Sequence, residues 1–577
     1  MEFGMIAVAA VIVLVGTSIL GSRIGVAAPL ILVVVGIGAG YLPFVPRVEI
    51  DPEVILIGVL PPLLYAAAVN VPLIDFRRNF RPVVGLSVLL VIISAVVVGL
   101  ILHLLVPVIP FPVGVALGAV ISPTDAVAAT SIGKRLGMPD RLVSILEGES
   151  LVNDATSLVL LKTALAAVAG SFVFWDAAGS FAFSVVAAIA IGFVMGLVTV
   201  WIRSKLRNPV YDTILSFVVP FVAFMPAEEI GASGVLAVVV TGLYTGHHAA
   251  KRFSAQARMN ERLNWRTVQF ALENGVFLVM GLQLHTLLDE VHETELQLER
   301  VALLAIGLVV LLILLRALFI FPLVWTMRGD QNRIEQRSVG LTRILSRARR
   351  SDTDSRRLRR LEILEQRSQA DLAHEQEQQL GWRDGAVLSW SGMRGVVTLA
   401  AAQSIPTSVP YRPQLILIAF LIAVITLLLH GLSLPIFIRK LWPKGANPKS
   451  NAAEMESLSH DLFEAVDAAL EDELEADEAH PDGHVLPNDD VLKRVRLNAK
   501  SALAPLAFPG APSTGPVSTR SQESQADCYR RLLRVALDAQ REALLEERAI
   551  GRYSSHTLRA AELALDAHEA RNSPTAL

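Results

Sequence analysis

The chain has 577 residues, of which 53% are hydrophobic and only 18% are charged, and its formal net charge at pH 7 is −3. A soluble protein carries about a quarter charged residues, so this composition argues against a soluble protein. Apolar runs of about 20 residues, long enough to cross a hydrocarbon core of about 30 Å, recur over residues 1–327 and 384–441. The composition therefore predicts an all-α polytopic membrane protein.

The hydropathy pattern predicts thirteen transmembrane helices. In chain order they are expected at 5–21, 25–41, 54–70, 83–107, 111–133, 141–170, 176–202, 209–226, 231–247, 264–288, 299–327, 384–405 and 412–439. The loops on one side hold fifteen lysines and arginines, whereas those on the other hold only Arg47, Arg300 and Arg412. Because positive charge concentrates in cytoplasmic loops, we expect an extracellular N-terminus and a cytoplasmic C-terminus in the plasma membrane.

Two segments fall outside the apolar regions and are expected in the cytoplasm. The insertion 328–383 has leucines at helical spacing among basic, acidic and glutamine residues, which predicts a surface helical hairpin. Its arginine pairs could contact anionic lipid headgroups, although a solvated helix with paired charges is the simpler interpretation, and its acidic residues argue against nucleic-acid binding. The apolar pattern predicts a membrane domain over 1–441 and a soluble tail over 442–577. In the tail we expect helices and a flexible linker at 505–525. We expect the tail to regulate the membrane domain or to pack in a dimer.

The predicted topology contains an internal repeat. Helices 1–6 and 8–13 would form two six-helix units of opposite orientation, and inverted repeats with broken helices at matching positions are typical of secondary transporters. The fifth helix contains ISPTDA, in which Pro123 removes an intrahelical hydrogen bond. The twelfth helix, its counterpart, contains SGMRG with two glycines. We therefore expect helices 5 and 12 to be broken and to cross.

Polar side chains interrupt the sixth helix within GESLVND. Glu147, Ser150 and Asp154 are spaced to share one helix face, and Glu149 and Asn153 form an adjacent stripe. A charged side chain at the bilayer centre costs about 2.5–3.5 kcal/mol on insertion scales, so these residues need compensating partners or ligands.

The broken helices add polar groups that could meet this stripe. Thr124 and Asp125 lie in the interruption of the fifth helix, and Arg394 lies in that of the twelfth. Carboxylate, amide, hydroxyl and carbonyl oxygens are hard ligands that suit Na⁺ or a similar ion. We expect Glu149 and Arg394 to form a structural ion pair, while Asp125 could either neutralise helix ends or bind the ion. Asp154 then has no cation left within these motifs, so we expect it to exchange a proton for a metal ion.

At this point a family resemblance is evident. The motifs ISPTDAVA, EGESLVNDATSLVL and SWSGMRGVVTLAAA, in this order, resemble those of the monovalent cation–proton antiporters that include bacterial NhaP and the animal sodium–proton exchangers. The segment LIGVLPPLLYAAAVN at 56–70 is similar to the third helix of that family, and the resemblance covers roughly residues 5–441. It implies a secondary antiporter exchanging Na⁺ or another monovalent cation for H⁺, not an enzyme, with no cofactor and with a homodimeric assembly.

The resemblance also implies roles for individual residues. Asp154 would carry the ion and the proton, and Asn153 would complete the ND pair of the electroneutral branch, which exchanges one proton for one cation. Thr124 and Ser150 would help to bind the ion. One departure concerns ion choice: some prokaryotic members have a glutamate just after LPPLL and its aromatic residue, where this chain has Ala66. The preference for Na⁺ over K⁺ or Li⁺ therefore stays open.

Further candidates and rival functions complete the prediction. Glu273, in FALENGVFLVMG, and Glu147 are candidates to line the ion pathway.

An intramembrane aspartyl protease using Asp125 and Asp154 is an alternative function, but the chain contains no GxGD motif. A non-transporting sensor is another alternative, against which the intact Asn153–Asp154 pair argues. A K⁺-preferring antiporter is a third.

Overall fold

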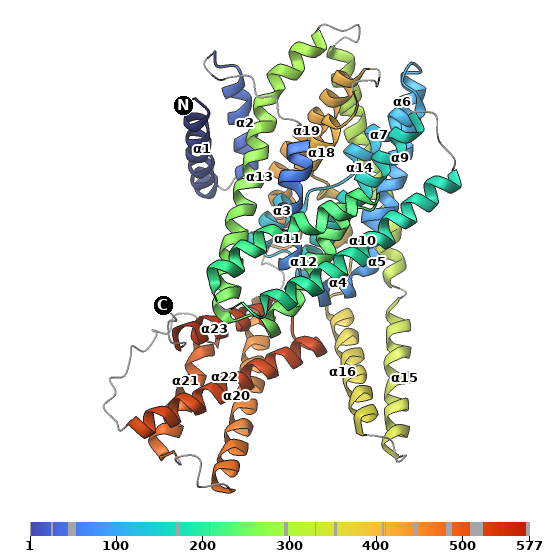
Figure 1. Ribbon diagram of the computed structural model, residues 1–577. Helices are drawn as coiled ribbons and strands as arrows, with labels where there is room; N and C mark the ends of the chain where they lie inside the picture. Colours follow the sequence, from blue (N-terminus) through green and yellow to red (C-terminus); the bar gives the residue numbers. More distant parts are fainter. Residues whose placement is uncertain are drawn as a thin grey trace. The chain divides into compact units, whose positions relative to one another are not determined.

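The structure is a computed structural model of the whole chain, shown in Figure 1. It describes all residues except 1, 25–26, 44, 46–52, 169–173, 207, 293–297, 329, 351–354, 407–408, 410, 444–447, 480–486, 508–522 and 573–577. The linker expected at 505–525 and the loop residue Arg47 therefore fall largely or wholly outside the described residues. Every regular element in the described part of the chain is a helix, as the composition predicts.

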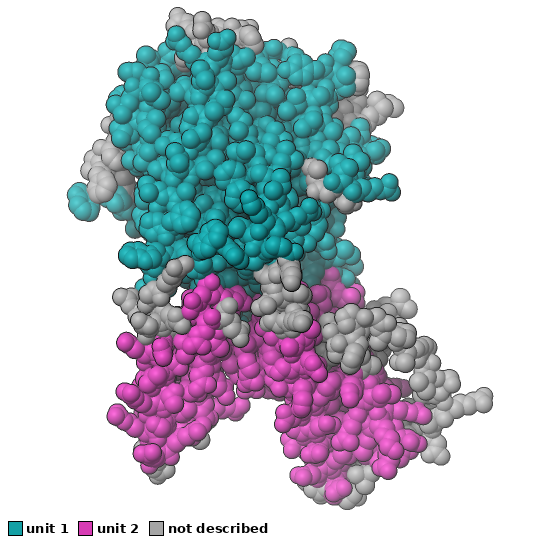
Figure 2. All heavy atoms as spheres, turned by 180° about the vertical axis from the view of Figure 1, so that it is seen from behind, with its two compact units in different colours: residues 1–252, 260–328, 380–446 teal, residues 253–259, 329–379, 447–577 magenta. Residues whose placement is uncertain are grey.

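Contacts divide the chain into two compact units, which Figure 2 shows in two colours. Unit 1 comprises residues 1–252, 260–328 and 380–446, and unit 2 comprises residues 253–259, 329–379 and 447–577. The insertion and the tail thus belong to the same unit. A short segment at 253–259 belongs to unit 2 as well, although the residues on both sides of it belong to unit 1.

Unit 1 contains the apolar helices. In chain order its elements are α1 (Glu2–Ile24), α2 (Ala28–Gly40), the π-helical segment η1 (Val54–Val59), α3 (Leu60–Asn70), α4 (Leu73–Arg78), α5 (Phe80–Val84), the π-helical segment η2 (Gly85–Leu89), α6 (Leu90–Leu105), α7 (Phe111–Ile121), α8 (Ala126–Leu136), α9 (Asp140–Val168), α10 (Phe174–Arg203), α11 (Pro209–Glu229), α12 (Gly234–Arg252), α13 (Ala255–His292), α14 (Leu298–Arg328), α17 (Trp382–Trp390), α18 (Val396–Gln403) and α19 (Arg412–Leu441). The first turn of α13 lies in unit 2.

Eight helical stretches in the described residues are long and apolar enough to cross a membrane: Phe80–Leu105, Phe111–Leu136, Asp140–Val168, Ala178–Arg203, Pro209–Glu229, Ala255–Asp289, Leu298–Met327 and Arg412–Leu441. Three shorter apolar helices lie at Val8–Gly21, Ala28–Gly40 and Val54–Asn70. The prediction of a polytopic helical membrane protein is confirmed. The count of thirteen spans and the inverted repeat stay predictions.

Several helices of unit 1 carry apolar side chains that are largely exposed. Phe183, Val186 and Phe193 on α10 are exposed, as are Leu314 and Leu318 on α14. A soluble protein rarely exposes apolar patches of this extent, whereas lipid chains solvate them without cost. These faces are therefore the lipid-facing surface of unit 1.

Small residues allow several helices of unit 1 to pack with their backbones close together. On α2, a Cβ atom added at Gly36 would lie 2.9 Å from the Cα of Gly281 on α13. On α7, a Cβ added at Gly118 would lie 2.7 Å from the Cα of Ala95 on α6. Because lipid provides no hydrophobic force between apolar helices, such close van der Waals packing supplies much of the attraction.

Unit 2 contains amphipathic helices. Its elements are α15 (Asp330–Arg350), α16 (Ser355–Glu377), α20 (Pro448–Ala479), α21 (Asp489–Ala507), α22 (Glu523–Ile550) and α23 (Ser555–Asn572). α15 and α16 pack against each other as the hairpin expected for the insertion, with Arg349 bonded to Glu362 at 2.9 Å. The tail helices bury two small apolar clusters, one that includes Leu462 of α20 and another that includes Leu470 of α20 and Leu532 of α22.

We predict that Gly36→Val and Gly38→Val will differ sharply although both lie on α2. A side chain at Gly36 would collide with the backbone of α13, whereas nothing lies within 4 Å of a Cβ at Gly38. Overpacking of a tight contact costs roughly 1–3 kcal/mol. Thermal melting of the purified variants should show a clear loss for Gly36→Val only. Equal melting of the two variants would contradict the α2–α13 contact.

Candidate functional site

Two interrupted helices meet inside unit 1. One break separates α7 from α8 at Ile121–Ala126, and the other separates α17 from α18 at Trp390–Val396, as expected from Pro123 and the glycines. The backbone N–H of Asp125 donates to the carbonyl oxygen of Met393 at 2.8 Å, which joins the two breaks directly. A Cβ added at Gly395 would lie 2.6 Å from the Asp125 Cγ, so only glycine fits there. The predicted crossing of the broken helices is therefore present.

Charged side chains satisfy the helix ends at this crossing. Arg394 Nη1 donates to the carbonyl oxygens of Ser122 and Pro123, at 2.7 and 3.1 Å, just after the C-terminus of α7. Asp125 caps the N-terminus of α8, because its Oδ1 accepts from the N–H of Val127 at 2.8 Å. A cation thus faces the negative end of one half-helix, and an anion faces the positive end of the other. Of the two roles considered for Asp125, this contact supports the helix-end role.

The partner of Glu149 differs from the expected one. Arg316 of α14 donates from Nη1 to Glu149 Oε1 at 2.5 Å and from Nη2 to Oε2 at 2.9 Å, and both side chains are buried. The prediction of an ion pair between Glu149 and Arg394 was therefore wrong. The physical reason is that the break in the fifth helix exposes carbonyl groups, which take the donors of Arg394. Glu149 is then free for a bidentate pair with a different helix.

Arg316 could have been recognised from its surroundings. It is the one charged residue in the apolar run GLVVLLILLRALFIFP, and an arginine within a membrane span requires a buried partner. Its Nε also donates to the carbonyl oxygen of Leu388 on α17, at 2.9 Å, so this one side chain links α14 to α9 and α17.

The polar stripe of α9 lies against the break between α7 and α8. The hydroxyl group of Thr124 donates to Glu149 Oε1 at 2.6 Å, and Asn153 Nδ2 donates to the Thr124 carbonyl oxygen at 3.0 Å. Ser150 Oγ accepts from the N–H of Ala126 at a long 3.4 Å. The structure thus brings together Thr124, Asn153, Ser150 and Glu149.

Two buried oxygen groups at this place have no donor. Asn153 Oδ1 is buried and accepts no hydrogen bond from the described residues. The Asp154 side chain, one residue on, is 9% exposed, and its carboxylate takes part in none of the described hydrogen bonds or ion pairs. The negative charge of Asp125 acts on it instead. Buried acceptors without donors are unfavourable unless a proton or a cation satisfies them.

The two further acidic candidates are placed differently. Glu147 pairs with Lys134 of α8, with Nζ and Oε1 2.6 Å apart, and both side chains are partly exposed. Glu273 of α13 accepts from Gln269 Nε2 at 2.7 Å, and the charge of Asp125 acts on it. At the position of the missing family glutamate, Ala66 is fully buried in α3.

Sequence reasoning missed a second buried charge cluster, at the ends of three helices. Arg203, the last residue of α10, forms a bidentate pair with Asp212 in the first turn of α11, at 2.7 and 2.9 Å. Its Nη1 also donates to Glu261 of α13 at 2.5 Å. All three side chains are buried. No motif in the sequence indicates this cluster.

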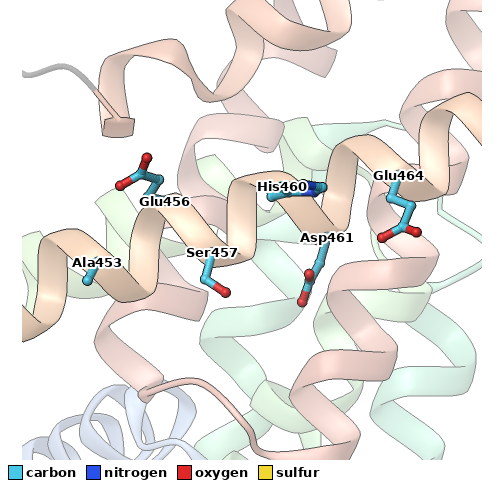
Figure 3. Close-up of a pocket in the computed structure, with 6 residues that line it drawn as sticks. All are labelled: Ala453, Glu456, Ser457, His460, Asp461 and Glu464. Carbon is cyan, nitrogen blue, oxygen red and sulfur yellow. The ribbon is translucent and has the colours of Figure 1, made fainter.

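Unit 2 contains a pocket of about 350 Å³. Figure 3 shows that its lining residues Ala453, Glu456, Ser457, His460, Asp461 and Glu464 all come from α20. Asp461 accepts a hydrogen bond from the Tyr553 hydroxyl group at 2.5 Å. Among the described residues no group of three His, Cys, Asp or Glu side chains is placed to hold a metal ion. The groups around Asp154 are of another kind, since they combine carboxylate, amide and hydroxyl oxygens.

We predict that Glu149 is energetically coupled more strongly to Arg316 than to Arg394. Removing one partner of a buried pair costs on the order of 3–5 kcal/mol, so Arg316→Gln and Glu149→Gln should each lower the melting temperature strongly. The double variant should recover part of the loss. As a control, Lys162→Gln, which breaks the more exposed pair with Glu228, should cost about 1 kcal/mol or less. Stronger coupling of Glu149 to Arg394 in the same double-mutant cycle would refute the assignment.

Comparison with known proteins agrees with this geometry. Residues 8–440 match the family model described as sodium/hydrogen exchanger, transmembrane. An uncharacterised Na⁺/H⁺ exchanger of Mycobacterium tuberculosis is 28% identical, and the match covers 98% of this chain and 96% of the relative. A sodium, potassium, lithium and rubidium/H⁺ antiporter of Bacillus subtilis is also 28% identical, over 71% of this chain and 57% of its own length.

A solved structure shows the same fold. The sodium proton antiporter MjNhaP1 from Methanocaldococcus jannaschii superimposes with a TM-score of 0.55 at 17% identity, covering 76% of this chain and 99% of that one. The family match extends over both broken helices and the polar stripe of α9. The chain therefore belongs to the family of transmembrane sodium/hydrogen exchangers.

Proposed function

We propose that Asp154 is the carboxylate that binds H⁺ and Na⁺ in turn during exchange. The observation that carries this proposal is the distribution of partners around the crossing. Glu149 is paired with Arg316, and Asp125 caps a helix, whereas the buried carboxylate of Asp154 has no described partner. A carboxylate held permanently by a cation or a helix end cannot easily cycle between proton and metal ion, but an unpartnered one can.

The neighbouring oxygens complete a cation site in this proposal. Asn153 donates through Nδ2 to Thr124, which keeps its Oδ1 available as an acceptor beside Asp154. The hydroxyl oxygens of Ser150 and Thr124 lie at the same break and serve as further ligands. Carboxylate, amide and hydroxyl oxygens suit a hard monovalent cation. When Asp154 is protonated, the site loses its negative charge and releases the cation.

We propose an electroneutral exchange of one H⁺ for one Na⁺. In this scheme Glu149 stays ionised because Arg316 balances its charge, and Asp125 stays ionised at the N-terminus of α8. Asp154 is then the one group that titrates during the cycle. The exchange moves no net charge, so the membrane potential, worth about 2.3 kcal/mol per charge per 100 mV, does not drive it.

The proposal also covers the domains, the orientation in the membrane and the ion pathway. We propose residues 1–441 as the transport domain and 442–577 as a cytoplasmic regulatory tail of a homodimer in the plasma membrane, with the N-terminus outside. Glu273 is proposed to line the ion pathway, since the charge of Asp125 reaches it. Glu147 is a weaker candidate, because Lys134 already neutralises it. The transported ions are the only small ligands that the proposal requires, and no cofactor takes part.

We predict that Asp154→Asn abolishes exchange but leaves the protein folded. An amide cannot release a proton to bind a cation, so the cycle stops, while the similar shape of asparagine preserves the packing. The measurement is the Na⁺-driven pH change inside proteoliposomes, repeated with K⁺ and Li⁺, together with the melting temperature. Asp176→Asn, at an exposed position near the start of α10, serves as the control and should exchange normally. A Na⁺-driven pH change retained by Asp154→Asn would disprove the assignment.

A further inference from the structure

The first turn of α13 belongs to unit 2. Phe253–Met259 pack with the tail, whereas Asn260 and the rest of the same helix belong to unit 1. Within this segment Arg258 is only 3% exposed. A buried arginine needs anionic partners, because its charge loses the solvation of water.

The partner of Arg258 lies 308 residues further along the chain. Asp566 of α23 is fully buried, and its two carboxylate oxygens lie 3.1 and 3.3 Å from Arg258 Nε. Arg258 Nη2 also donates to Asp566, and Nη1 donates to the carbonyl oxygen of Phe253. The planar guanidinium thus contacts the carboxylate through two of its nitrogens, an arrangement that fixes orientation as well as distance.

The surrounding charges balance one another. Arg541 of α22 donates to Asp566 at 3.0 Å and pairs with Glu569 at 2.6 Å. Burial and the neighbouring charge of Arg258 lower the pKa of Arg541. Two cations therefore face two carboxylates, and the cluster can be buried without net charge. Asp566 is the member that contacts both arginines, so its loss removes the close carboxylate partner of Arg258, whereas Glu569 lies 3.9 Å from Arg258 Nη2.

The next turns of α13 join the transport domain. Glu261, three residues after Arg258, accepts from Arg203 in the buried cluster with Asp212. Trp265 is 1% exposed and packs against Tyr65 of α3, with ring centroids 5.0 Å apart. Glu273, the proposed pathway residue, follows two turns later on the same helix. Because an α-helix is stiff over a few turns, the position of its first turn affects all of these contacts.

We infer that Asp566 is a positioning residue that the tail supplies to the transport domain. By holding Arg258, it fixes the first turn of α13 and thereby the placement of Glu261 and Glu273. The tail then contributes to the rate of exchange, and loss of the contact between Asp566 and Arg258 lowers that rate. This inference rests on exchange by the protein, but not on which carboxylate carries the ion.

The tail contains a matched control pair. Arg531 of α22 donates to Asp477 of α20 at 2.5 Å, and the Asp477 side chain is 3% exposed. Asp477 is buried whereas Arg531 is partly exposed, and their ion pair joins two tail helices, α20 and α22, rather than the tail and α13. Asp477→Asn should therefore weaken the tail to a similar degree without releasing α13.

The experiment compares full-length variants in proteoliposomes. Asp566→Asn, Arg258→Gln, their double variant and Asp477→Asn are each tested for Na⁺-driven pH change over a range of Na⁺ concentrations, and for melting temperature. We expect Asp566→Asn and Arg258→Gln each to lower the maximal rate at least threefold, and the double variant to be no worse than either one. Asp477→Asn should melt earlier than wild type but exchange normally. Arg258→Lys, which keeps the charge, should recover part of the rate.

The outcomes separate this inference from the proposed function. If Asp566→Asn exchanges like wild type, or if Asp477→Asn loses as much rate as Asp566→Asn, then Asp566 contributes only to the stability of the tail and the inference is overturned. If the wild-type protein itself shows no exchange with any monovalent cation, the proposed function fails instead.

Discussion

The crossing of two interrupted helices is the constraint on which the rest of the transport domain depends. A break in a helix inside a membrane leaves carbonyl and N–H groups without partners, and no water is present to satisfy them. Here Arg394 satisfies the carbonyl end of α7, Asp125 satisfies the N–H end of α8, and one backbone bond joins Asp125 to Met393. Gly395 is required because any side chain there would collide with Asp125. The charges of Arg394 and Asp125 therefore stabilise the ends of the broken helices.

This use of charge determines which carboxylate can take part in exchange. Once Arg394 is occupied by carbonyl oxygens, Glu149 needs another cation, and Arg316 of α14 provides it. Asp154 is then the buried carboxylate in the polar stripe of α9 without a described partner. The same logic of buried charge applies to the tail, where Asp566 holds Arg258 at the beginning of α13. In both places a pair of charges fixes the relative position of segments that are distant in sequence.

The sequence predicted the features that depend on local patterns. It did not predict the ion pairs between residues that are distant in sequence. Apolar length predicted a polytopic helical membrane protein, and Pro123 with the glycines near Arg394 located both breaks. The spacing of Glu149 and Asn153 placed them in one stripe along the helix, and the structure brings both to Thr124. The partner of Glu149 was missed because Arg316 lies 167 residues away and outside any motif. The contact of Arg258 with Asp566 was missed for the same reason, since ion pairing over such a distance depends on the tertiary fold.

The most direct test of the account is to count the protons that leave when Na⁺ binds. Purified protein in a weakly buffered solution, at a pH where the empty site is protonated, would be titrated with Na⁺ while proton release and bound Na⁺ are both measured. The account predicts one H⁺ released for each Na⁺ bound, and no release from Asp154→Asn. Na⁺ binding without proton release, two protons per Na⁺, or release that persists in Asp154→Asn would contradict the claim that a single carboxylate at position 154 binds the two ions in turn.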